Sequence, residues 1–116
     1  MRLSALCTRR ISACFRTGGI RLVPFSPLHD AALPADLHGL LLYGGYPELY
    51  AVPLAGMPEC VRAFAGQSRE GCPCMAECGG FMYLHEKMQD MQDHWYPMAG
   101  VLQGESYRTP KLGRFG

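Results

Sequence analysis

Cys78 stands where enzymes commonly place a nucleophile, on a turn that joins a strand to a helix. The apolar run 72–76 predicts a short buried strand, and two glycines then begin an amphipathic stretch that predicts a helix over 80–91. At the start of a helix the positive end of the dipole favours the thiolate, the form of cysteine that attacks electrophiles. The small glycines also let a substrate approach the backbone closely. Cys78 is therefore the first candidate for a nucleophile.

A second glycine turn, Gly44-Gly45, follows another apolar run, 39–43. Acyl transfer from an amide needs backbone N–H donors where the oxyanion of the tetrahedral intermediate forms. Gly79, directly after the nucleophile, is one candidate donor, and the Gly44-Gly45 turn offers another. In a parallel sheet, turns at the carboxyl ends of neighbouring strands lie side by side, and ligands bind there. Together the two turns predict an acyl-transfer site.

Two acidic residues close to these turns each have two interpretations. Glu48 could orient a substrate near the second glycine turn, or it could cap the segment that follows Pro47. Glu77 could line the pocket, or it could stabilise the start of the predicted helix through its negative charge.

The histidines are weaker candidates than the cysteine. His85 lies two turns along the predicted helix from Cys78, so its ring should point away from the thiol. His94 lies beyond that helix. His29 and His38 flank the turn before the second strand, where we expect satisfied or exposed side chains and not ligands.

Six cysteines raise two alternatives to a catalytic thiol, a disulfide framework and a metal site. Their neighbours are apolar and the start of the chain does not resemble a secretory signal, so we expect reduced thiols in a cytoplasmic protein. The pattern C-x-C-x-x-x-C at 72–78 lacks the second cysteine pair of a zinc site, so no metal is predicted, although a metal module remains an alternative. We expect the remaining cysteines to fill the core or to serve in packing: Cys72 and Cys74, then Cys7, Cys14 and Cys60.

Hydrophobic periodicity predicts an α/β fold built on a mostly parallel sheet. Strand-like runs alternate with helix-like runs, which is the pattern of crossover connections between parallel strands. The predicted strands are 20–25, 39–43, 72–76 and 96–102, and the predicted helices are 57–67 and 80–91. Met82, Met88 and Met91 recur at helical spacing, and we expect them to pack in the core.

The first 18 residues are hard to assign to this pattern. The run 11–16 could form a first strand, but only Thr17-Gly18-Gly19 separates it from the strand at 20–25. A parallel crossover needs a dozen or more residues. We therefore expect a first strand that is misplaced or frayed, and we divide the chain into an N-terminal segment, 1–18, and a domain segment, 19–116.

The composition is that of one small globular domain. The 116 residues include 48% hydrophobic and 18% charged residues. With a formal net charge of +1 and scattered Arg and Lys, the chain lacks the basic stripe of nucleic-acid-binding proteins. No apolar run approaches the roughly 18 residues of a membrane span. We therefore expect neither nucleic acid nor a membrane as a partner.

Three segments resemble the class I glutamine amidotransferase-like domain of cobyrinic acid a,c-diamide synthase. They are 22–34, which begins Leu-Val-Pro-Phe-Ser-Pro-Leu, 42–49, which contains Gly-Gly-Tyr-Pro-Glu, and 76–84, which contains Glu-Cys-Gly-Gly-Phe. The closing run 111–116 is similar to the family's sequence after its nucleophile turn. The segments cover 19–116 in the family's order, so the resemblance implies the front part of a flavodoxin-like, three-layer class I amidotransferase sandwich.

The resemblance also implies roles for individual residues. Cys78 would be the glutaminase nucleophile that forms a glutamyl thioester, and Gly45 and Gly79 would bind its oxyanion, with Gly44 and Glu48 in the substrate site. The substrate would be glutamine. In the family, the released ammonia amidates acetate side chains a and c of a corrin ring, after ATP and Mg²⁺ activate them, in cobalamin biosynthesis. The family is thus an ATP-dependent carbon–nitrogen ligase.

The chain departs from the family in two features. The family's histidine base lies downstream of the position where this chain stops, and neither His85 nor His94 replaces it. The ATP-dependent synthetase domain is also missing, since no phosphate loop G-x-x-x-x-G-K-[ST] occurs. We therefore expect no cofactor to bind this chain, no contact with the corrin except through that missing domain, and no activity of the chain alone.

Two functions remain open, and with them the question of whether the chain is an enzyme. The first is a fragmentary glutamine amidotransferase domain. The second is a non-catalytic, truncated module that binds a partner subunit and in which Cys78 is a relic. In both, apolar surface that later strands of the domain would cover should be exposed, which predicts marginal stability and allows self-association.

Overall fold

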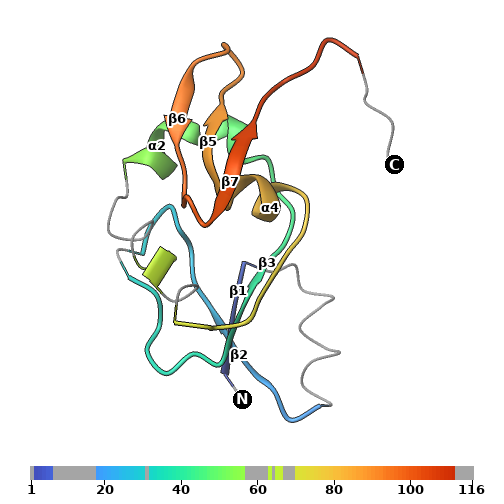
Figure 1. The fold of residues 1–116 in the computed structure, drawn as a ribbon. Helices are drawn as coiled ribbons and strands as arrows, with labels where there is room; N and C mark the ends of the chain where they lie inside the picture. Colours follow the sequence, from blue (N-terminus) through green and yellow to red (C-terminus); the bar gives the residue numbers. More distant parts are fainter. Residues whose placement is uncertain are drawn as a thin grey trace.

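The computed structural model describes residues 18–30, 32–56, 63, 65–66 and 70–111, together with the backbone of 2–6. These residues form two sheets, shown in Figure 1 with the smaller sheet above the larger one. The larger sheet has four strands in the order β2-β1-β3-β4, and each neighbouring pair is parallel. Its strands are β1 (Arg2–Leu6), β2 (Arg21–Pro24), β3 (Gly39–Leu42) and β4 (Cys74–Ala76). The predicted parallel α/β sheet is confirmed.

Strand β3 carries the centre of the core because all four of its residues are buried. Leu40 and Leu42 join the main apolar cluster, whereas Leu41 packs separately with Ile20, Leu22 and Tyr43. A strand buried on both faces must be apolar without alternation, which explains why its sequence reads as one continuous run. The strands predicted at 20–25, 39–43 and 72–76 are thus confirmed with slightly shorter bounds, but the expectation that 72–76 is buried is wrong, because Cys74 and Met75 of β4 are exposed.

The first strand lies earlier in the chain than the sequence suggested. The structure places it at Arg2–Leu6, between β2 and β3, and the run 11–16 falls outside the described residues. The connection between β1 and β2 thus runs from 7 to 20, and this number of residues is sufficient for a parallel crossover. The sequence suggested only 11–16 as a possible first strand, misplaced or frayed, and the regular strand at Arg2–Leu6, which pairs with both β2 and β3, was not predicted.

Short helical segments follow strand β3. After β3 come the 3₁₀ helix η1 (Pro47–Leu49) and the helix α2 (Ala51–Ala55), which buries Ala51 and Leu54. Pro53 is tolerated within α2 because it lies in the first turn, where the N–H has no intrahelical acceptor. Of the helix predicted over 57–67, only Ala63, Ala65 and Gly66 are described, and these three are helical.

The helix predicted over 80–91 is mostly wrong. Helix α4 (Gly79–Tyr83) ends after five residues, and the chain continues as strand β5 (His85–Gln89). His85 is therefore on a strand and not on the helix after Cys78. The strand forms because it has two partners, antiparallel β6 (Trp95–Pro97) and parallel β7 (Leu102–Ser106). The single strand predicted at 96–102 is likewise wrong, since β6 and β7 are separate strands.

The smaller sheet and α4 share the core of the larger sheet. Tyr83 and Leu84 at the end of α4, and Met98 and Ala99 after β6, pack in the same cluster as Leu40 and Leu42 of β3. Met88 is fully buried, as predicted, but it points inward from a strand. Met91 lies in the turn after β5 and is exposed, so its predicted place in the core is wrong. No helix among the described residues is long and apolar enough to span a bilayer.

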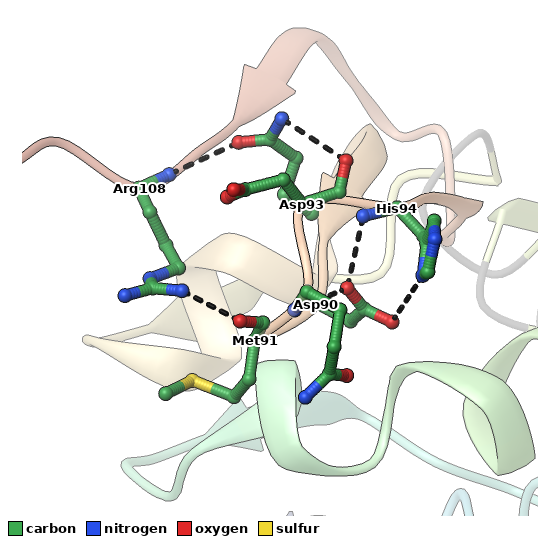
Figure 2. A network of polar contacts seen from close by, with 7 residues as sticks. Asp90, Met91, Asp93, His94 and Arg108 are labelled. Carbon is green, nitrogen blue, oxygen red and sulfur yellow. Dashed lines mark hydrogen bonds and ion pairs between the residues drawn. The ribbon is translucent and has the colours of Figure 1, made fainter.

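A buried carboxylate organises the turn between β5 and β6 (Figure 2). The Oδ1 atom of Asp90 accepts hydrogen bonds from the backbone N–H groups of Gln92, at 2.8 Å, and His94, at 2.9 Å. Its Oδ2 atom lies 3.4 Å from Nδ1 of His94. Arg108, beyond β7, donates from Nη1 to the Met91 carbonyl at 2.6 Å. The turn is thus tied both to itself and to the segment that leaves β7.

These contacts set the acidity of Asp90. Burial alone would raise the pKa of this carboxyl, but the hydrogen bonds from His94 and Gln92 and the nearby imidazole lower it below its ordinary value. A lowered pKa in the folded state means that the ionised carboxylate stabilises the fold.

The fold predicts different costs for truncating two methionines. Met88→Ala should reduce the free energy of unfolding by about 2–5 kcal/mol, because it opens a cavity beside a side chain that is 0% exposed. Met91→Ala is the matched control, since Met91 is 42% exposed and should cost less than about 0.5 kcal/mol. Urea denaturation of both variants measures the difference, and equal losses would contradict the strand assignment of β5.

The Asp90 contacts predict a pH-dependent stability. The contribution of the carboxylate is fully present above the ordinary aspartate pKa of about 4 and disappears as pH falls through the lower pKa of the folded state. Wild type should therefore melt several degrees above Asp90→Asn at pH 7 and at nearly the same temperature at pH 2. A difference in melting temperature that persists unchanged at pH 2 would show that the charge is not responsible.

Candidate active site at two glycine turns

The two glycine turns predicted from the sequence lie side by side at one edge of the parallel sheet. Strands β3 and β4 pair in parallel with Leu42 opposite Ala76. The N–H of Glu77 donates to the Leu42 carbonyl at 2.8 Å, which extends the ladder by one residue. Gly44-Gly45 and Cys78-Gly79 therefore leave adjacent strands at the same carboxyl edge.

Direct backbone contact holds the turns together. A Cβ atom on Gly79 would lie 2.6 Å from the Gly45 carbonyl oxygen and 2.7 Å from Cδ of Pro47. A Cβ atom on Gly80 would collide with the Leu42 carbonyl. Both glycines are buried, so no side chain fits at either position. The sequence Cys-Gly-Gly is thus a packing requirement as well as a turn.

Cys78 occupies a strained turn that presents its side chain outward. Its backbone angles, φ 53° and ψ −119°, match the first central position of a type II′ turn. The closing hydrogen bond runs from the N–H of Gly80 to the Glu77 carbonyl at 3.0 Å. This conformation favours glycine, and a cysteine there costs on the order of 1–3 kcal/mol. An exposed cysteine in such a strand-to-helix turn has the geometry of a nucleophile elbow.

Backbone N–H groups next to the thiol are available as donors. Neither Gly45 nor Gly79 donates its N–H to another described residue. The helix dipole stabilises negative charge at this turn less than the sequence suggested, because α4 has only five residues and its dipole is therefore small. The arrangement can therefore offer a sulfur nucleophile and two candidate donors for a developing negative charge. The turn, more than the helix dipole, positions these groups.

A cavity of about 160 Å³ opens beside the turns. Its walls are the four glycines of the turns, three tyrosines, three leucines and two prolines: Gly44, Gly45, Gly79, Gly80, Tyr46, Tyr50, Tyr83, Leu28, Leu42, Leu54, Pro27 and Pro47. Neither Cys78 nor Glu48 is part of the wall. Sequence reasoning missed the tyrosines, because residues that line a cavity from separate segments carry no local pattern.

The other candidate residues lie away from this cavity wall. Glu48 is half-buried in the single turn of η1, whose N-cap is Tyr46, and no side chain makes a capping hydrogen bond there, so Glu48 does not cap this segment. Glu77 is exposed beside the elbow, and His29 and His38 are exposed as expected. His85 lies on β5, where its Nδ1 atom is 3.1 Å from Oγ of Ser106 and its ring meets Phe81 edge-on.

The cysteines next to the elbow differ from the prediction. Cys74 is exposed, so its expected place in the core is wrong, whereas Cys72 is half-buried. Desolvation raises the pKa of both thiols, and the neighbouring Cys72 raises that of Cys74 further.

Within the described part of the chain, no group of three His, Cys, Asp or Glu side chains is arranged to hold a metal ion. Cys7, Cys14 and Cys60 lie outside the described residues.

A parallel sheet with a cysteine elbow beside a second glycine turn defines an amidotransferase-like α/β domain. The comparison with known proteins specifies the family. Residues 14–114 match the CobB/CobQ-like glutamine amidotransferase domain. Since this match covers most of the chain, the chain belongs to that family.

Curated relatives agree with the family assignment. The chain is 42% identical over 98 residues to cobyrinate a,c-diamide synthase of Caldanaerobacter subterraneus, and 40% and 42% identical over the same length to the enzymes of that name in Dehalococcoides mccartyi and Salmonella typhimurium. Each match covers 84% of this chain but only 21–22% of the relative. The chain thus spans about a fifth of the length of these relatives, and the resemblance seen in the sequence is confirmed.

The turn geometry predicts unequal effects of two glycine substitutions. Gly79→Ala should destabilise the chain by about 1–3 kcal/mol, because its methyl group meets the backbone of Gly45. Gly44→Ala is the matched control, since a methyl group there meets nothing within 4 Å and its φ is not positive. It should change the free energy of unfolding by less than about 1 kcal/mol. Equal effects in thermal unfolding would mean that the two turns do not pack as described.

Proposed function

We propose that this chain provides the nucleophile and the oxyanion donors with which a glutamine amidotransferase hydrolyses glutamine. The observation that carries the proposal is the type II′ turn that exposes Cys78 next to Gly79, which in turn packs against the backbone of Gly45. The family match and the Gly-Gly-Tyr-Pro-Glu sequence at 44–48 support it. The chain's own residues thus account for two of the three parts that acyl transfer requires.

The reaction begins at the side-chain amide of glutamine. The Cys78 thiolate attacks the amide carbon, a carbon–sulfur bond forms, and the carbonyl oxygen becomes an oxyanion. The N–H groups of Gly45 and Gly79 stabilise this charge. When the intermediate collapses, the carbon–nitrogen bond breaks and the nitrogen leaves as ammonia with the proton given up by the thiol. Water then hydrolyses the glutamyl thioester to glutamate and restores the thiol.

The third part, a general base that carries the proton from sulfur to nitrogen, is not assigned to a described residue. His85 is engaged by Ser106 and Phe81, and His94 belongs to the β5–β6 turn. By resemblance to the family, the base is a histidine from a later part of the domain. We therefore propose that Cys78 can be acylated slowly in this chain and turns over efficiently only with that histidine.

The destination of the ammonia follows from the relatives. We propose that, in a complete synthase, it amidates activated carboxylates a and c of a corrin, as the name cobyrinate a,c-diamide synthase indicates for the relatives. ATP and Mg²⁺ would act in another part of that enzyme. The residues described here do not fit them, because the glycine turns border an apolar cavity and no group of carboxylates is placed for a cation.

A second candidate function rests on a different observation. Four large apolar side chains are exposed on and around η1 and α2: Tyr46, Leu49, Tyr50 and Val52. Exposed apolar residues clustered in this way are typical of surfaces that contact another protein or another part of the same domain. We propose as the alternative that the chain is a non-catalytic module that binds a partner subunit, or associates with itself, through this surface.

The glutaminase proposal predicts selective alkylation of Cys78. A diazoketone analogue of glutamine should modify Cys78, because its diazo carbon takes up a proton from water, the thiolate then attacks that carbon, and dinitrogen leaves. Mass spectrometry of the digested chain locates the adduct. The Cys78→Ser variant should lose it, and Cys74→Ser, which removes an exposed thiol on the strand before the turn, should keep it.

Two controls separate the candidates. Excess glutamine should slow the alkylation of Cys78 at least severalfold, whereas iodoacetamide should modify exposed cysteines without such protection. Equal labelling of Cys74 and Cys78 by the analogue, or no protection by glutamine, would contradict the glutaminase proposal and leave the partner-binding module as the better reading.

A further inference from the structure

The segment Cys72-Pro73-Cys74 carries two thiols that the glutaminase proposal does not use. It lies at the amino end of β4, whereas the glycine turns lie at the carboxyl edge of the sheet. The N–H of Leu40 donates to the Pro73 carbonyl at 2.9 Å, so the pairing with β3 already includes the residue between the two cysteines. The residue before a proline also favours extended backbone. The segment is therefore extended from Cys72 onward.

The two thiols lie on the same face of the sheet. In an extended strand, side chains two residues apart point to the same side. Cys72, two residues before Cys74, and Ala76, two residues after it, both pack against the main core cluster. Cys74 therefore lies between them on that face, where it is exposed, whereas Cys72 is half-buried. One thiol is thus open to solvent and the other borders apolar side chains.

The spacing brings the two sulfur atoms within reach of one small ion. Alternate residues of a strand are about 6.6 Å apart along the chain. A metal ion bound between two thiolates holds the sulfur atoms about 4.6 Å apart, at about 2.3 Å for each metal–sulfur bond. Each sulfur therefore moves only about 1 Å toward the other. Pro73 fixes one backbone angle between the cysteines, which lowers the entropy lost on binding.

The thiols already interact electrostatically. Burial raises the pKa of both, and the neighbouring Cys72 raises the pKa of Cys74 further, because two thiolates side by side repel each other. A cation bound between the sulfur atoms removes this repulsion. The pair therefore favours a positively charged ligand.

Two thiolates with no further ligand select a soft ion of low coordination number. Structural zinc takes four ligands, and no group of three His, Cys, Asp or Glu among the described residues is placed around one point. Met75 points to the opposite face, where its Sδ atom lies 3.7 Å from the Tyr43 hydroxyl. Cys78 lies beyond the end of β4, on the type II′ turn. Soft thiolates select Cu(I), which accepts two of them in a linear arrangement.

We propose that Cys72 and Cys74 bind one Cu(I) ion between their sulfur atoms. On binding, two thiol protons pass to solvent and two copper–sulfur bonds form, and neither copper nor sulfur changes its oxidation state. The proposal does not rest on the glutaminase function, because neither thiol belongs to the glycine turns or to the wall of the cavity beside them.

The test adds one equivalent of Cu(I) to the reduced chain without oxygen. After a short reaction with iodoacetamide, tandem mass spectrometry of the digested chain reports the reactivity of each cysteine. Copper should slow the alkylation of Cys72 and Cys74 together, by about tenfold or more, and leave that of Cys78 nearly unchanged. X-ray absorption at the copper edge should show two sulfur neighbours. Protection of one member of the pair alone, protection of another cysteine instead, or a third sulfur neighbour would overturn the proposal.

Variants locate the site. In competition with the Cu(I) chelator bicinchoninate, Cys72→Ser and Cys74→Ser should each weaken copper binding by about a hundredfold or more, because one of two ligands is lost. Cys78→Ser is the matched control, since it removes the exposed thiol of the elbow and should keep the affinity of the wild type. If Cys72→Ser fails to fold, the exposed position of Cys74 still provides the comparison.

Equal copper affinity of Cys74→Ser and wild type would overturn the proposal, as would an equal loss in Cys78→Ser. Alkylation of Cys78 by the glutamine analogue, measured on the copper-free chain, reports the glutaminase function independently.

Discussion

The contact between the backbones of two turns is the constraint on which the rest of this structure depends. Gly79 and Gly80 leave no room for a side chain against Gly45 and Leu42, and the Glu77 N–H donates to the Leu42 carbonyl. These contacts fix the end of β4 relative to the end of β3. They also hold Cys78 in a conformation that an isolated peptide would rarely adopt. The strain at one residue is thus offset by the packing of its neighbours.

The smaller sheet supports this arrangement from the other side of α4. Helix α4 has only five residues and could not hold itself together in water. Its last turn is fixed because Tyr83 and Leu84 are buried with Met88 of β5 and with Met98, the residue that follows β6. Asp90 closes that hairpin. The position of the elbow therefore depends on residues that follow it in the chain by as many as twenty positions.

The same packing separates a thiol from an apolar cavity. Cys78 is exposed on the turn, while the glycines next to it line a cavity without charged side chains. Side chains are excluded at Gly79 and Gly80 because they would collide with Gly45 and Pro47 at the first position and with Leu42 at the second.

The sequence by itself determined the parallel sheet, its apolar strands β2, β3 and β4, and the pairing of a cysteine turn with a second glycine turn. Each of these has a local signal: a continuous apolar run, or glycine at a position that only glycine tolerates. Only the tertiary structure decided that 85–89 is a strand, that the first strand lies at Arg2–Leu6, and that three tyrosines meet at the cavity. The spacing of Met82, Met88 and Met91 suits a helix, yet β6 and β7 supply the hydrogen bonds that make a strand. Such partners are distant in the chain, so no local pattern could reveal them.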